Sequence, residues 1–241
     1  MRYPHRIKIY KKRWHLVVTF VVIVLPFFFI AAFSRITGVE ATSIFADLGR
    51  SAFRMAIAYA ITVVLALFLS IVFGQGKIGN FFLPVFDVLQ NFPSFALLPL
   101  FTLWFGPGNF SVIVFLVITI IWPILFSILS SIHMVRKDLE EAAYIFGARG
   151  WKKIWAFTIP NVFPGLMTGS LVGLGDGWEA VVGAEIIGLT PGIGKFLGDA
   201  SAAENIRVLA FGIIALLLFI FTLNKLIFLP LLKRSQDYSH E

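Results

Sequence analysis

Three acidic residues interrupt an apolar, glycine-rich stretch that reads LMTGSLVGLGDGWEAVVGAEIIG, residues 166–188. Asp176 and Glu179 are three residues apart, so in a helix they share one face, whereas Glu185 lies six residues beyond Glu179 and need not join them. A carboxylate inside a bilayer is costly and usually turns toward a polar interior. We expect Asp176 and Glu179 to face such an interior rather than lipid, and a paired structural cluster and a solute-facing cluster stay equally open.

The longest polar connection in the chain reads MVRKDLEEAAYIFGARGWKKIWAFTIP, residues 134–160. Asp138 followed by Glu141 resembles a capping box and predicts a short helix that begins at Leu139. Gly147 is suited to end that helix in a left-handed conformation. A second helical stretch is expected from Trp151 to Phe157.

The first of these two helices combines acids, small residues and an aromatic ring, which is unusual for a plain linker. Ala142 and Ala143 allow a neighbour to approach closely, and Glu141 offers a carboxylate to a backbone donor or an arginine. Phe146 needs a partner. The pattern indicates either a helix that fits a groove on a partner protein or an interfacial helix that lies on lipid headgroups.

The composition places these residues in a membrane protein. The chain has 241 residues, of which 59% are hydrophobic and 14% are charged, and its mean hydropathy is +0.90. Soluble domains carry about 45–50% apolar and about 25% charged residues, so a disordered chain is excluded and a soluble enzyme is not expected. The sequence contains no cysteine, which excludes disulfides, a thiol nucleophile and a cysteine-ligated zinc site. We assign no catalytic residue and no metal site to it.

Six apolar runs are long enough to cross a hydrocarbon layer of about 30 Å as helices. They lie at Trp14–Phe33, Ser51–Phe73, Asn80–Phe105, Phe110–Met134, Ile159–Ile187 and Val208–Leu232. An open sheet would leave its edges unpaired in lipid, so the predicted fold class is an all-α membrane protein with six transmembrane helices. The first run is too long for a signal-peptide core and is expected to be retained. Prolines predict kinks in the third and fourth runs, at Pro84, Pro93, Pro99 and Pro123.

Lysines and arginines set the expected orientation. Fifteen of them fall on the side of the two termini and five on the other side, which predicts that both termini are cytoplasmic. The net charge of +7 therefore reflects topology, and we expect no nucleic-acid partner. The expected organisation is a basic cytoplasmic segment at residues 1–13, a transmembrane domain at residues 14–232 with a cytoplasmic loop at residues 135–158, and a cytoplasmic tail at residues 233–241. The basic segment would lie on anionic lipid or in solvent.

The cytoplasmic loop resembles the EAA loop of ABC-importer permeases. Glu141-Ala142-Ala143 is followed by Gly147-Ala148 and later by Ile159-Pro160, in the order of that family's motif. The ending is TIP here, in place of the commoner LP form.

Three further segments are similar to permeases of the nitrate, sulfonate and taurine type, and the resemblance covers roughly Leu48 to Leu232. Residues 91–106, NFPSFALLPLFTLWFG, are similar to the segment IPxxALxPLxxLWFG of that type. Residues 178–185, WEAVVGAE, are similar to its stretch WxxxVAAE, and Gly192-Ile193-Gly194 stands where the family has GLG.

The resemblance implies the permease fold of type I ABC importers, in the cytoplasmic (inner) membrane of a bacterium or archaeon. It implies no enzyme activity and no cofactor on this chain, because ATP and magnesium would bind two copies of a partner ATPase. A second permease subunit (the same chain or a related one), an extracytoplasmic substrate-binding protein and membrane lipid would be the other partners. The residues expected to couple to the ATPase are Glu140, Glu141, Ala142, Ala143, Gly147 and Ala148. The pathway candidates are Asn91, Pro93, Asp176, Trp178, Glu179 and Glu185.

Other functions stay open. The three acids would also suit a proton-coupled secondary transporter, and the loop would suit a non-transporting membrane scaffold. The nearest match to a phosphate-binding loop, GLTPGIGKF at residues 188–196, lacks the first glycine at the required spacing and has Phe196 where a magnesium-binding hydroxyl is needed. Asp176 and Glu179 depart from the apolar or neutral residues usual in the family, so an amine-bearing solute fits the charges whereas an anion fits the resemblance.

Overall fold

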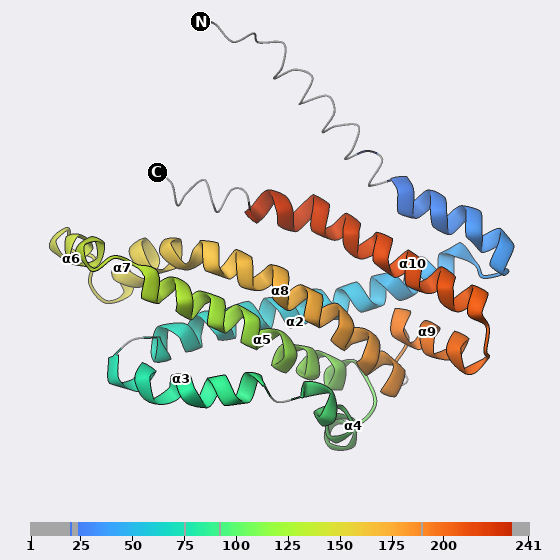
Figure 1. Ribbon diagram of the computed structural model, residues 1–241, viewed down its shortest axis with the longest axis horizontal. Helices are drawn as coiled ribbons and strands as arrows, with labels where there is room; N and C mark the ends of the chain where they lie inside the picture. The colour runs from blue at the N-terminus through green and yellow to red at the C-terminus, as the bar shows by residue number, and fades with distance from the viewer. Residues whose placement is uncertain (1–19, 21–23, 75, 92, 189, 233–241) are drawn as a thin grey trace, which may run out of the picture.

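The computed structural model describes Phe20 and residues 24–232, except for residues 75, 92 and 189, and the expected terminal segments 1–13 and 233–241 lie outside this part. Every regular element in the described residues is a helix, and the long helices run lengthwise through an elongated bundle (Figure 1). After an apolar helix at Val24–Thr37, the elements are α2 (Ala41–Phe73), α3 (Gly76–Gln90), η1 (Ser94–Leu97), α4 (Leu98–Phe105), α5 (Asn109–Met134), α6 (Lys137–Ile145), α7 (Trp151–Lys153), η2 (Ile154–Thr158), α8 (Ile159–Ile187), α9 (Ile193–Ala202), α10 (Ile206–Leu223) and η3 (Asn224–Phe228).

Four uninterrupted helices are long and apolar enough to cross a membrane. They are Ala41–Phe73, Asn109–Met134, Trp151–Ile187 and Ile206–Leu232. A broken pair of helices adds a fifth candidate, and the expected first run lies partly outside the described residues. The structure confirms an all-helical protein with four or five candidate spans in the described residues, and the count of six stays a prediction.

The expected third span, Asn80–Phe105, is not one helix. Its two halves meet at an angle of 76°. Pro93 lies at the break in an extended conformation, ahead of the 3₁₀ turn η1, because its ring fixes φ and removes the backbone donor that a helix would need. Pro99 sits in the first turn of α4, where a missing N–H costs nothing, and Pro84 and Pro123 lie within α3 and α5. Pro93 therefore lies at the point where the helix of this span is interrupted.

The fifth expected span is longer than predicted. The helical stretch that begins at Trp151 continues through a π-helical turn at Ile154–Thr158 into α8, so that one helix of 37 residues runs to Ile187. The expected boundary at Ile159-Pro160 is not a break, because Pro160 stands in the first turn of α8.

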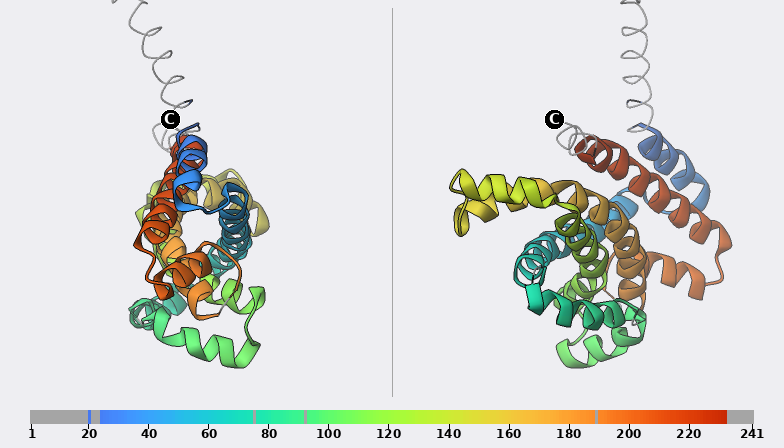
Figure 2. Two further views of the ribbon diagram at one scale, coloured as in Figure 1. Left: turned by 90° about the vertical axis from the view of Figure 1, so that its right-hand side faces the viewer. Right: turned by 60° about the vertical axis from the view of Figure 1, so that its left-hand side comes forward.

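The centre of the bundle is the contact between α5 and α8, which lie side by side (Figure 1, Figure 2). Glycines on α8 allow this approach: a Cβ on Gly169 would stand 2.7 Å from the carbonyl oxygen of Pro123 and 2.8 Å from the Cα of Ile124. Gly173 meets Ile120 and Pro123 in the same way, at 3.1–3.3 Å. This contact fixes one face of α8 and thereby decides where its acidic residues point.

Candidate functional sites

The helix α6 begins two residues before the predicted Leu139. Arg136 is its N-cap residue, and no side chain caps the first turn. The predicted capping box between Asp138 and Glu141 was wrong, because the Asp138 carboxylate instead accepts two hydrogen bonds from the Arg136 guanidinium, at 3.1 and 2.5 Å. This bond also lowers the pKa of the exposed Asp138 carboxyl.

The end of α6 agrees with the prediction for Gly147. Its φ is +83°, the left-handed region. The Gly147 N–H donates to the Tyr144 carbonyl at 3.1 Å, and the Ala148 N–H donates to the Ala143 carbonyl at 2.9 Å. These two bonds form the Schellman motif, which turns the chain sharply back toward α7.

The helix α6 projects from the end of the bundle and exposes large apolar side chains at its C-terminal end (Figure 1). Tyr144, Ile145 and Phe146 are 57%, 79% and 87% exposed, and Ala142 and Ala143 are half-buried. The helix makes no extensive contact with another described helix. An aromatic and aliphatic surface of this kind marks a place for a partner or a membrane surface.

One ion pair connects α6 to the helix that follows it. The Lys153 ammonium lies 2.5 Å from the Glu140 carboxylate, and both side chains are half-buried. A hollow of about 550 Å³ lies beside this pair and is lined by both residues and by Glu141, Tyr144 and Ile145. The nearby His133 places its Nδ1 2.7 Å from the carbonyl oxygen of Leu129.

A second cavity contains Asp176 and Glu179. It has a volume of about 320 Å³, and both acids are exposed. Its wall comes from α8, α5 and the break after α3, through Gln90, Ser94, Phe95, Thr119, Trp122 and Pro123 as well as the two acids. None of these lining residues is basic, and neither acid forms an ion pair with a described residue.

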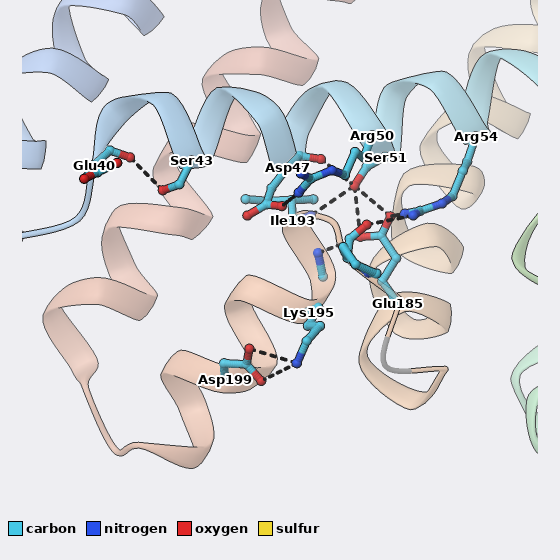
Figure 3. Close-up of polar contacts among 12 residues, drawn as sticks. Glu40, Ser43, Asp47, Arg50, Ser51, Arg54, Glu185, Ile193, Lys195 and Asp199 are labelled. Carbon is cyan, nitrogen blue, oxygen red and sulfur yellow. Dashed lines mark hydrogen bonds and ion pairs between the residues drawn. The ribbon is translucent and has the colours of Figure 1, made fainter. Parts of the chain in front are cut away.

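Glu185 lies elsewhere, as a fully buried side chain within a polar network (Figure 3). Its carboxylate accepts a bond from Arg54 Nη1 at 2.5 Å, bonds from the Ser51 hydroxyl at 2.7 and 2.9 Å, and one from the Gly194 N–H at 2.8 Å. Arg54 also donates to the Asn109 side chain and to the Pro191 carbonyl, both at 2.7 Å. The network joins α2, α5, α8 and α9, and it satisfies the charge of Glu185 without any ligand.

The remaining pathway candidates lie in two places. Trp178 is 6% exposed and packs edge-on against Phe219 of α10, with ring centroids 5.8 Å apart, so its side chain does not line the acidic cavity. Asn91 and Pro93 lie at the break between α3 and η1, next to the cavity-lining Gln90 and Ser94. The structure thus brings Asp176 and Glu179 together near this break and separates Trp178 and Glu185 from them.

Sequence reasoning missed the pairing of Arg54 with Glu185 and the hydrogen bonds that Ser51 and Asn109 make to this pair. A single arginine within an apolar run was the available signal for a buried ion pair. No local pattern shows that the bend of the chain at Pro191 and Gly192 brings α9 onto Glu185. A Cβ on Gly192 would overlap the Glu185 carboxylate. The described residues contain no group of three or more histidines and acids that could hold a metal ion.

Comparisons with known proteins point in one direction. A family model described as the inner membrane component of binding-protein-dependent transport systems matches residues 62–230. The taurine transport system permease protein TauC of Escherichia coli (strain K12) is 29% identical over 173 residues, which are 67% of this chain and 63% of that protein.

Two other relatives have similar identities. The putative aliphatic sulfonates transport permease protein SsuC of Bacillus subtilis (strain 168) is 28% identical over 71% of this chain and 62% of its own length. The nitrate import permease protein NrtB of Synechococcus elongatus is 30% identical over 61% of this chain and 53% of its own length. The matched region thus spans less than two thirds of each of these relatives.

Proposed function

The chain belongs to the family of inner membrane components of binding-protein-dependent transport systems, and we propose that it forms the substrate pathway of an ATP-driven importer. It is a multi-pass protein of the cytoplasmic membrane and is similar to ABC permeases of the nitrate, sulfonate and taurine type. In the proposal, six helices cross the bilayer and both termini are cytoplasmic. The position of α6 and α9 at opposite ends of the bundle supports this topology (Figure 1).

The observation that carries the proposal is the exposed helix α6. An ATPase that closes on ATP must push a rigid element of the permease, and a short helix with exposed Ile145 and Phe146 fits a groove on such a partner. The half-buried Ala142 and Ala143 leave room for close approach, and Glu141 is exposed and available to a donor on the partner. Gly147 turns the chain back within the groove, next to Ala148.

The coupling part of the proposal is tested by Glu141→Lys and Gly147→Trp. The first variant reverses the charge offered to the ATPase, and the second removes the left-handed turn, because a bulky side chain strongly disfavours φ near +83°. Both proteins should reach the membrane, and ATP-driven transport and stimulation of ATP hydrolysis by the binding protein should fall together. Normal transport by both variants would contradict the assignment of α6 as the helix that couples to the ATPase.

We place the solute pathway at the cavity of Asp176 and Glu179. Two carboxylates, the indole of Trp122 and hydroxyls of Ser94 and Thr119 surround a space of about 320 Å³ without a basic residue. This chemistry favours a cationic or amine-bearing solute, held by charge-assisted hydrogen bonds and by the ring face. The relatives are named for taurine, sulfonates and nitrate. An anionic solute would need a cation from a second subunit, or protonation of the two acids to remove their negative charge.

The double replacement Asp176→Asn with Glu179→Gln tests this placement, since it keeps the shape and removes the charge. Hydrogen bonds to charged groups contribute about 1.5–3 kcal/mol, so losing one weakens a solute contact by about tenfold or more. Transport should fall while the ATPase still copurifies. If the acids are only structural, thermal stability should fall and transport per molecule should persist; no change in either property would contradict both interpretations.

The proposed complex contains two ATPase subunits that hold ATP and magnesium, a second permease and an extracytoplasmic binding protein. Copurification of the tagged chain would reveal which protein is the second permease.

A further inference from the structure

The link between α6 and the bundle is weak on both sides of the helix. Toward α5 it consists of Val135 and Arg136, which are both extended. Toward α7 it contains Gly147 and Gly150, with φ of +83° and +51°. These short extended and glycine-containing links leave α6 free to swivel unless side chains hold it.

Side-chain contacts of α6 that stay within its own loop cannot hold it. The Arg136–Asp138 pair joins the N-cap residue to the first turn of the same helix. The Arg149 guanidinium lies 4.3 Å from the centre of the Tyr144 ring, but Arg149 belongs to the loop itself. Neither contact reaches the membrane-spanning helices.

The Glu140–Lys153 pair does reach them. Lys153 stands in the first turn of the continuous helix Trp151–Ile187, which carries Asp176 and Glu179 and packs along α5. Among the ion pairs of the described residues, this is the one that joins α6 to that helix. A displacement of α6 is therefore delivered to α8 through a charged contact, as well as through the backbone.

We propose that Glu140 and Lys153 form a strut within this chain that positions α6 on the α7–α8 helix, so that movement of the docked ATPase tilts α8 and changes access to the acidic cavity. Glu140 then acts as a positioning residue that faces its own chain, whereas Glu141 faces the ATPase. The inference rests on the proposed function.

The test uses the complete complex in proteoliposomes and a cysteine at Ser94→Cys, which lines the acidic cavity and is the single cysteine of this chain. The probe is the rate at which a maleimide labels that cysteine, read by mass, without nucleotide and after trapping with MgATP and vanadate. In the parent complex the rate should change on trapping. Glu140→Gln and Lys153→Met should each reduce that change by about two- to fivefold, the range expected for a half-exposed ion pair.

The charge-exchanged variant, Glu140→Lys with Lys153→Glu, should restore at least half of the response, because it rebuilds the pair with opposite polarity. Asp138→Asn is the matched control: it removes an ion pair of the same helix that does not reach α8, and its response should equal that of the parent. An unchanged response in Glu140→Gln, a failed restoration, or an equal loss in Asp138→Asn would overturn the strut. Loss of ATPase copurification in Glu140→Gln would also overturn it, because Glu140 would then contact the ATPase directly.

These failures are distinct from failure of the proposed function. If the parent complex contains no ATPase, or if its cysteine never responds to nucleotide, the importer proposal itself is wrong. If the parent responds and the variants respond equally, the importer proposal stands and the strut alone is wrong.

Discussion

Replacing Arg54 with methionine should destabilise the protein more than the same replacement of Arg50, the other arginine of α2. The Arg54 and Glu185 side chains are 5% and 0% exposed. Methionine fills a similar volume, but among the described residues it leaves the Glu185 carboxylate with the Ser51 hydroxyl and the Gly194 N–H as its donors. Removing one partner of a buried ion pair costs about 3–5 kcal/mol, because the remaining charge is uncompensated.

The expected change is large enough to measure by thermal unfolding of the purified protein in detergent or lipid nanodiscs. One kcal/mol corresponds to about 2–4 °C for a chain of this length, so Arg54→Met should lower Tm by about 6–20 °C. Arg50→Met is the matched control, because Arg50 lies one turn earlier on α2 and its side chain is 53% exposed in a pair with Asp47. An exposed pair contributes at most about 1 kcal/mol, so this variant should lose no more than about 4 °C.

The double variant Arg54→Met with Glu185→Gln distinguishes a buried charge from lost packing. Removing both charges leaves no uncompensated ion, and at least half of the lost stability should return. A drop of less than about 2 °C in Arg54→Met would refute the reasoning, and so would a double variant as unstable as the single one.

Two further predictions concern packing and topology. Gly169→Ala should lower the free energy of unfolding by about 1–3 kcal/mol, because its Cβ would meet backbone atoms of Pro123 and Ile124. Gly175→Ala meets no described atom within 4 Å and should be neutral or slightly stabilising in the same unfolding assay. Equal effects of the two replacements would contradict the α5–α8 contact. Single cysteines at Ser201 and Ala148 should lie outside and inside the cell, so an impermeant thiol reagent on intact cells should label position 201 and spare position 148, and the reverse pattern would overturn the orientation.

The sequence was sufficient where local chemistry dominates. Apolar runs of membrane length predicted the long helices, and Gly147 predicted the left-handed end of α6, because no other residue type adopts that conformation so readily. It was insufficient where a choice between possible contacts decides. The Arg136 guanidinium, two residues away, binds Asp138 and removes the capping box, and the kink predicted at Pro93 is a break of 76° between two helices.

The acidic residues show the same division. Spacing alone placed Asp176 and Glu179 on one face and left Glu185 apart, because helix geometry is periodic. The partners of Glu185 depend on the packing of α8 against α2, because Ser51 and Arg54 stand 134 and 131 positions away from it in the sequence. A contact over that separation has no periodic signature in one sequence.

The central claim, that this chain is the permease of an ATP-driven importer, is tested most directly by uptake into proteoliposomes that contain the complete complex. A panel of radiolabelled amines, sulfonates and inorganic anions would be added with the binding protein, with ATP either enclosed or omitted, and with or without an ionophore that collapses the proton gradient. The account predicts uptake that requires ATP and the binding protein and is indifferent to the ionophore. Uptake that follows an imposed proton gradient without ATP would contradict it and would identify the acids of α8 as proton carriers.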